Sequence, residues 1–349
     1  MDFSKTKIKY LITHEIGNKL RDEKLFLSQN IQIIDNEIEK TLLSYFLKSF
    51  QVVQDEFNFF HNSDLNLNEV NSYTTNIFEK QNEISFVKNS QDIAKHLYDF
   101  SLHPKIVKGE LIIVQLCDIG YDNQNINIIG VFKSEKKDSF LKIIKDNEAI
   151  NLNNDQGINT SKIEKGCLIL NTNDNRYKVF NIDNQSNSTD YWTNKFLNIK
   201  PLKNNIHKTK EIIKICINFS DEILSTNYDT DIEFSFNNDY IDYFESNESY
   251  DLESFTSHVF KNEDVKKEFF EYQSSNKEVF DIELDERFEV SQNDVKKEKK
   301  KIKNIIKLDT KLELKVLLDK DSGTKNIEKG FDTDKGMSFY KIYFNEEIK

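Results

Sequence analysis

The 349-residue chain has few of the residues that interrupt helices and strands and few that form disulfide crosslinks. It has only 2 prolines and 9 glycines, which leaves little room for long flexible linkers. Its 3 cysteines, Cys117, Cys167 and Cys216, lie far apart without a C-x-x-C pair, so we expect free structural thiols in a reducing compartment. No apolar run approaches the roughly 20 residues of a membrane span, and no signal segment is recognisable. These absences predict a cytoplasmic location.

The chain also lacks the short motifs that mark common enzymes and cofactor sites. It contains no Walker loop, no G-x-S-x-G, no H-E-x-x-H and no dinucleotide fingerprint. We therefore expect no enzymatic activity, no cofactor and no metal. The alternative is a DNA-processing enzyme whose site is assembled from residues distant in sequence. Only three arginines occur, Arg21, Arg176 and Arg287. Since arginine is the usual bidentate reader of guanine, base-specific DNA recognition is not expected.

Core-forming side chains are nevertheless abundant. The sequence holds 27 phenylalanines and 14 tyrosines, and a folded chain of this length buries about three quarters of its unfolded surface. An ordered protein of two domains is therefore predicted, with residues 1–200 in the first and residues 201–349 in the second.

The first domain is predicted to be α+β, with an antiparallel meander backed by helices. Asn36 and Glu39 resemble a capping box that begins one helix, a short helix is expected at residues 70–78, and Ser90 is placed as the N-cap of a further helix that ends before Pro104. Short apolar runs separated by polar turns predict strands at residues 7–16, 25–34, 111–117, 126–132, 140–144, 167–170 and 177–182. Most connections are too short for crossover helices, which favours antiparallel pairing.

The second domain is predicted to be helical and to end in a small antiparallel sheet. Ile212, Cys216, Phe219 and Ile223 mark one face of its first helix. Period-two patterns near residues 280–284, 312–318 and 337–344 predict a three-stranded C-terminal unit.

Negative charge is concentrated in one segment of this second domain. Residues 221–255 hold eleven acids and no lysine or arginine, while the whole chain has a net charge of -12. Aromatic residues are interleaved with these acids. Such a surface can bind a basic protein or imitate the phosphate spacing of nucleic acid. We place the partner face at Asp239, Asp242, Tyr243 and Glu245. In the alternative interpretation the acids are solvated helix faces and the aromatics belong to the core.

Positive charge is concentrated in a second segment, residues 296–307. Dense lysines neutralise phosphates without reading bases, which gives salt-sensitive, sequence-independent DNA affinity. In the alternative interpretation this is a solvated helix or loop. The candidate phosphate contacts are Lys296, Lys297, Lys299, Lys300, Lys301, Lys303 and Lys307.

Several stretches resemble one known family. The main stretch runs from Ser90 to Glu135 and includes Ser90 to Tyr98, His103-Pro104-Lys105-Ile106, Gly109-Glu110-Leu111-Ile112-Ile113-Val114 and Gly130-Val131-Phe132-Lys133-Ser134-Glu135. The others are Leu25-Phe26-Leu27-Ser28, Gly157-Ile158-Asn159, Lys165-Gly166-Cys167-Leu168-Ile169, Tyr191-Trp192 and the stretch from Tyr340 to Asn345. With these stretches the chain resembles the bacterial nucleoid-associated (NdpA-like) proteins. The resemblance implies a soluble protein associated with the chromosome, and it carries no active-site residues.

Two hypotheses follow. In the first, the protein contacts double-stranded DNA through residues 296–307 and is located at the nucleoid. In the second, it is a non-enzymatic adaptor that binds a basic DNA-handling protein through residues 221–255. A homodimer is an alternative to a monomer in both.

Overall fold

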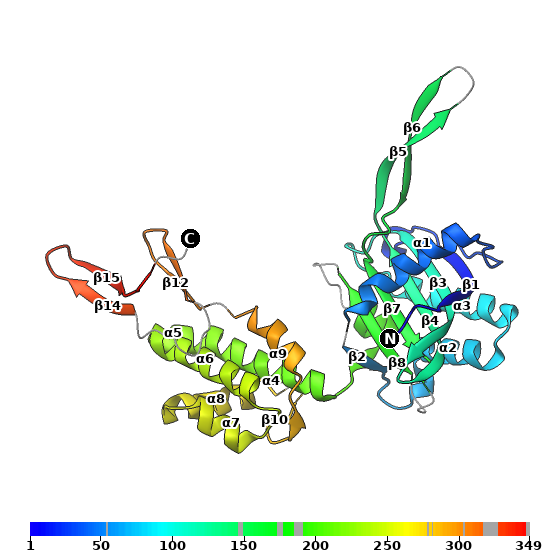
Figure 1. The fold of residues 1–349 in the computed structure, drawn as a ribbon. Helices are drawn as coiled ribbons and strands as arrows, with labels where there is room; N and C mark the ends of the chain where they lie inside the picture. Colours follow the sequence, from blue (N-terminus) through cyan, green and yellow to red (C-terminus); the bar gives the residue numbers. More distant parts are fainter. Residues whose placement is uncertain are drawn as a thin grey trace. The chain divides into compact units, whose positions relative to one another are not determined.

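The computed structural model describes residues 1–349 except 54, 146–148, 173–176, 185–190, 278, 281, 303, 317–326 and 347–349. The chain divides into two compact units, Met1–Leu202 and Lys203–Lys349 (Figure 1). The N-terminal unit contains a large antiparallel sheet with helices, and the C-terminal unit contains helices followed by small antiparallel sheets. The predicted α+β class is confirmed.

A seven-stranded sheet forms the centre of the N-terminal unit. All its neighbouring strands pair antiparallel. In spatial order the strands are β1 (Lys7–Ile16), β3 (Gly109–Tyr121), β4 (Gln124–Ser134), β7 (Lys165–Leu170), β8 (Lys178–Asp183), β2 (Glu56–Phe59) and β9 (Ile199–Pro201).

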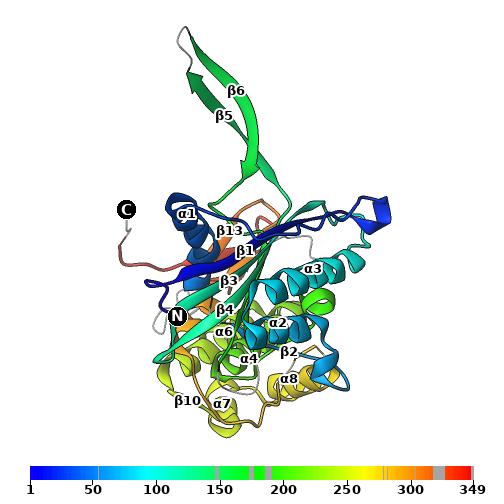
Figure 2. The ribbon, with the colours of Figure 1, turned by 90° about the vertical axis from the view of Figure 1, so that its right-hand side faces the viewer.

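Helices cover both faces of this sheet. Side chains alternate along a strand, so Leu111 and Ile113 of β3 face one core while Ile112 and Val114 face the other. Helices α2 (Glu69–Lys80) and α3 (Glu83–Asp99) pack in the first core, and α1 (Asn36–Leu47) packs in the second (Figure 2). Because both faces of β3 are buried, nearly every residue along the strand is apolar.

The chain leaves the sheet between β4 and β7 to form a separate hairpin. Strands β5 (Lys137–Lys145) and β6 (Ile150–Ile158) pair only with each other and extend away from the sheet (Figures 1 and 2). Every residue of β5 is exposed. Only the base of the hairpin reaches a core of the sheet, through Ile158 at the end of β6.

Three local predictions for this unit were wrong. The N-cap of α1 is Asp35, whose side chain accepts from the Glu37 and Ile38 amides, so Asn36 is the first residue of the helix rather than its cap. Residues 25–34 form no strand, since only Phe26 makes an isolated bridge to Glu15. Helix α3 begins at Glu83, where the Asn82 side chain caps it by accepting from the Ser85 amide at 2.8 Å. Ser90 is therefore a buried residue in the middle of the helix rather than its N-cap.

The C-terminal unit is built from helices around one aromatic core. Its residues include Phe219, Tyr240, Phe244, Phe255 and Phe269. The elements are α4 (Asn205–Phe219), a π-helical turn (Ser220–Leu224), α5 (Ser225–Asn227), α6 (Thr230–Ser246), β10 (Ser249–Tyr250), α7 (Leu252–Val259), α8 (Glu263–Ser275), β11 (Phe288–Glu289) and α9 (Gln292–Lys299).

Two hairpins follow these helices. Strand β12 (Asn304–Lys307) pairs with β13 (Glu313–Val316), and β14 (Ile327–Asp332) pairs with β15 (Met337–Ile342). Among the described residues these are separate two-stranded sheets, so the predicted three-stranded unit was wrong. Phe280, Ile282 and Leu284 are buried, but they belong to the helical core instead of a strand.

Candidate nucleic-acid interface

The lysine segment, residues 296–307, begins on α9 and continues into β12. Val295 and Glu298 are buried on one side of α9, which packs against α4 and α6. Lys296, Lys297 and Lys300 are exposed on the other side. Lysines in the last turn also interact favourably with the partial negative charge of a helix C-terminus. The amphipathic pattern of α9 therefore places the lysine charges at the surface.

Four lysines of the segment are paired with acids of the same unit. Lys299 lies 3.0 Å from Glu245, and Lys301 lies 2.7 Å from Glu298. Lys297 lies 3.5 Å from the buried Asp294. Lys307 lies 3.8 Å from Glu313, its neighbour across the β12–β13 hairpin. The positive charge available to a ligand is therefore smaller than the lysine content suggests.

Two lysines remain available. Lys296 and Lys300 are exposed, and neither forms an ion pair with any residue that the structure describes. They are four residues apart, and residues at this spacing lie on the same face of a helix, about 6 Å apart at their Cβ atoms. Lys303 lies outside the described residues. The candidate phosphate contact is thus centred on Lys296 and Lys300, with Lys297 and Lys301 beside them.

The three acids of the predicted partner face all have side-chain partners within the unit: two are lysines and one is a histidine. Asp239 lies 2.7 Å from Lys261, and Asp242 lies 3.2 Å from His258. Glu245 accepts from Lys299, so the acidic segment and the lysine segment meet directly. A basic partner protein would have to displace these side chains.

The aromatic residues of the acidic segment belong to the core. Tyr243 is only 1% exposed, and its hydroxyl is hydrogen bonded to Ser254 at 2.7 Å. It contacts Phe244 and Phe255 edge to face. Placing Tyr243 on a partner face disagrees with this burial, because helix periodicity turns the aromatics inward while the acids face water.

The sequence did not predict that the acidic segment and the lysine segment pair with each other. Glu245 and Lys299 are separated by 54 residues, and only the packing of α6 against α9 brings them together. The opposite sign of the two segments is the one signal that points to it.

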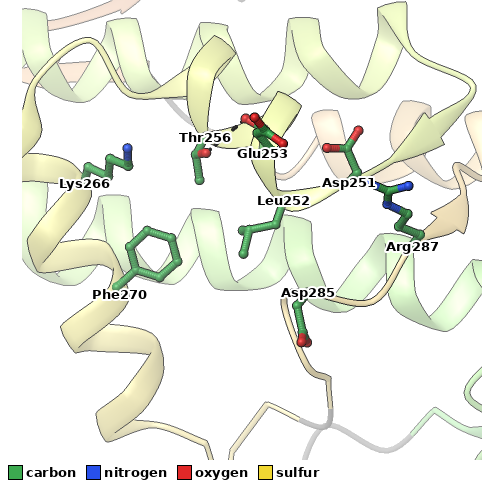
Figure 3. Close-up of a pocket in the computed structure, with 8 residues that line it drawn as sticks. All are labelled: Asp251, Leu252, Glu253, Thr256, Lys266, Phe270, Asp285 and Arg287. Carbon is green, nitrogen blue, oxygen red and sulfur yellow. Dashed lines mark hydrogen bonds between the residues drawn. The ribbon is translucent and has the colours of Figure 1, made fainter.

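A cleft of about 370 Å³ lies beside α7, and it contains Arg287 (Figure 3). Its lining mixes both charge signs, with Lys266 and Arg287 among Asp251, Glu253 and Asp285. Hydrogen bonds from Ser254, helped by the nearby Arg287, hold the pKa of Asp251 below its usual value. Three acids and two cations line the cleft, so it has no marked preference for an anion.

Other classes of site find no support in the described part of the chain. It contains no group of three or more histidine, cysteine, aspartate or glutamate side chains arranged to hold a metal ion. None of its helices is both long enough and apolar enough to cross a membrane.

Fold and site thus define a two-unit α+β protein with an exposed lysine face on its C-terminal unit. The chain belongs to the family of the nucleoid-associated protein YejK, whose family model matches residues 12–336. The predicted family is confirmed, and it supports a nucleoid-associated role. No curated protein gives a significant match to the chain.

Proposed function

We propose that the protein associates with the nucleoid by contacting phosphates of double-stranded DNA through the lysine segment. The observation that carries the proposal is the pair Lys296 and Lys300, which is exposed on one face of α9 and has no described acidic partner. Membership of the nucleoid-associated family points to DNA as the ligand, and DNA phosphates carry the charge opposite to that of the two lysines. Contacts of this kind release counterions and do not read sequence.

The affinity is expected to be modest and sensitive to salt. The chain as a whole carries a net charge of -12, and residues 221–255, with eleven acids and no lysine or arginine, repel DNA near the lysine face. Each phosphate contact contributes about -0.9 to the slope of log affinity against log salt concentration. A few contacts therefore give weak binding that is lost as salt is raised.

The test is a salt series with purified protein and random-sequence duplex DNA. The double variant Lys296→Glu and Lys300→Glu should weaken binding and reduce the magnitude of the salt slope by about 2. The matched control is Lys40→Glu with Lys88→Glu, which changes two exposed lysines of the N-terminal unit that form no ion pair with any described residue. It makes the same change in net charge, so equal loss in both variants would refute a localised contact.

The adaptor hypothesis predicts a different result in the same assay. Purified protein would not bind DNA even at low salt, and a basic DNA-handling protein would be retained in its place. Changing Asp239, Asp242 and Glu245 to the corresponding amides would release that partner. Asp239 and Glu245 already pair with lysines of the same unit, which makes this the second hypothesis.

A further inference from the structure

One face of the β5–β6 hairpin is apolar and open to solvent. Residues that lie opposite each other in an antiparallel pair share a face, and Leu152 lies opposite Ile143 while Ile150 lies opposite Lys145. Leu141 is two residues before Ile143 and therefore lies on the same side. Each of these four aliphatic side chains is at least 62% exposed. Apolar side chains gathered in this way on a surface are typical of a contact site.

The hairpin also has two open edges. Strands β5 and β6 pair only with each other among the described strands, and the hairpin extends away from the large sheet (Figures 1 and 2). An isolated two-stranded hairpin is marginally stable in water, whereas three or more strands with an apolar face can be stable. An open edge is also a template for another strand. Strands added along one edge would therefore stabilise the hairpin.

The charges of β5 are self-complementary. Asp138 and Lys142 lie on the same face of the strand, two residues before and two residues after Phe140. If two copies of β5 pair antiparallel about a two-fold axis at Phe140, each Lys142 lies opposite the Asp138 of the second copy. Opposite charges at such positions stabilise a pair of strands.

Both side chains are able to make this contact. Lys142 is exposed and forms no ion pair with any residue that the structure describes. Asp138 is exposed and accepts from the Asn159 side chain through its Oδ2 at 2.6 Å, and a carboxylate can accept further donors. The edge of β6 has no such pattern, because Asp155 is its one charged residue. The charge pattern therefore selects the β5 edge and a second copy of the same chain.

We propose that the protein forms a two-fold symmetric dimer in which the β5 edges of two copies pair antiparallel about Phe140. The two hairpins then make one four-stranded sheet, and the same surface of each copy is used, as two-fold symmetry requires. Leu141 lies opposite the second copy's Ser139, and Ile143 lies opposite the second copy's Lys137. The aliphatic stem of that lysine can cover Ile143.

The affinity of this dimer is expected to be modest. Strand β5 has nine residues and is about 30 Å long. A contact along one such edge is smaller than the roughly 800 Å² per partner of a typical stable interface. We therefore expect monomer and dimer to exchange at micromolar concentrations.

The experiment is sedimentation of the full chain without DNA between about 1 and 100 μM. The monomer mass is 41.2 kDa, and the average mass should rise toward twice this value with concentration. Either Asp138→Lys or Lys142→Asp sets like charges opposite each other at two places and should weaken association by about tenfold or more. An equimolar mixture of the two variants should associate again, because every facing pair then has opposite charges.

Two controls accompany these variants. Asp155→Lys makes the same charge change on the same face of the hairpin but on β6, and it should associate like the wild type. The fluorescence of Trp192, the single tryptophan, confirms that the N-terminal unit of each variant is folded.

A cysteine placed at the two-fold axis tests the register. Phe140→Cys sets two thiols opposite each other, about 5 Å apart at their Cβ atoms and close to the range of a disulfide. Ile144→Cys is its matched control on the same strand and face, since Ile144 lies opposite the second copy's Lys136 and about 27 Å from the second copy's Ile144. Mild oxidation should crosslink Phe140→Cys and leave Ile144→Cys at the level of the wild type, which contains the partly exposed Cys117.

Three results would overturn the proposal. A chain that stays monomeric at about 100 μM would leave the apolar face to a different protein. Dimers of equal affinity in Asp138→Lys and Asp155→Lys would place the interface on another part of the chain. Crosslinking of Ile144→Cys in preference to Phe140→Cys would mean that the strands pair in a different register.

Discussion

The Lys299 ammonium group lies 3.0 Å from the Glu245 carboxylate, and this pair joins the lysine segment to the acidic segment. Both side chains are about one third exposed, so the pair is accessible to water and salt. Exposed pairs of this kind contribute little to stability. The pair matters for the surface charge instead. While Lys299 is bound to Glu245, its positive charge is not available to an anionic ligand at α9.

Releasing Lys299 should strengthen the proposed contact with DNA. In the variant Glu245→Gln we expect tighter binding to duplex DNA at low salt and a salt slope steeper by about 0.9, the value for one more phosphate contact. The control is Glu271→Gln, which removes the same charge from the Lys267 pair on α8. An unchanged slope in Glu245→Gln, or an equal change in both variants, would contradict the model.

The imidazole of His14 is buried and neutral in the N-terminal unit. His14 is 1% exposed, and its Nδ1 accepts from the Ser28 amide at 3.1 Å. Its Nε2 must then carry the proton and donate to the Ser90 Oγ at 3.1 Å, while the Ser90 hydroxyl donates to the Val87 carbonyl. Burial lowers the pKa of His14 to about 4. Protonation would also set an N–H against the Ser28 amide.

The stability of the N-terminal unit should therefore fall with acid. The unfolded histidine titrates near pH 6.5 and the folded one near 4. Between these values the unfolded state binds more protons, so the stabilisation is complete above pH 6.5 and is lost as the pH falls toward 4. The difference corresponds to about 3 kcal/mol. Urea unfolding followed by Trp192 fluorescence measures it.

The variant His14→Gln isolates this contribution. It should be less stable than the wild type at pH 7.5, and the difference should shrink by about 3 kcal/mol at pH 4. His103→Gln, a change at an exposed histidine, should run parallel to the wild type. A constant difference between His14→Gln and the wild type across this range would refute the assignment.

The sequence predicts the centre of the sheet better than its margins. Strands β3, β4 and β7 are apolar on both faces because helices cover both, and such runs are visible without a structure. Strand β2 has four residues and β9 has three, one of which is Pro201, so neither carries a strand pattern long enough to notice. Residues 25–34 look like a strand because they carry apolar side chains. Leu25, Leu27 and Ile31 pack on the core, but the segment does not join the hydrogen-bonded sheet.

The candidate sites show the same division. The exposed lysine face of α9 can be predicted from the sequence, because the positions of its lysines depend on one helix alone. The pairing of Glu245 with Lys299 depends on how separate helices pack. No local pattern encodes such packing, so this feature required the structure.

Lys133 is fully buried beside the base of the β5–β6 hairpin. Its Nζ donates to the Glu135 Oε1 at 2.8 Å, to the Val107 carbonyl at 2.9 Å and to the Tyr191 hydroxyl at 3.3 Å. The Tyr191 hydroxyl also donates to the Glu135 Oε1 at 3.0 Å. Burial lowers the pKa of Lys133 while Glu135 raises it. Breaking such a pair leaves an uncompensated charge in the core.

Lys133→Met should therefore destabilise the N-terminal unit by about 3–5 kcal/mol, because it leaves the buried Glu135 carboxylate without its cation. The double variant Lys133→Met with Glu135→Met should recover most of that loss, since an apolar pair of similar volume carries no desolvation penalty. Lys137→Met is the control: Lys137 pairs with Glu110 but is 45% exposed, and its loss should cost under about 1 kcal/mol. Urea unfolding followed by Trp192 fluorescence gives all three values. If Lys133→Met costs no more than Lys137→Met, the buried network does not hold the charged form of Lys133.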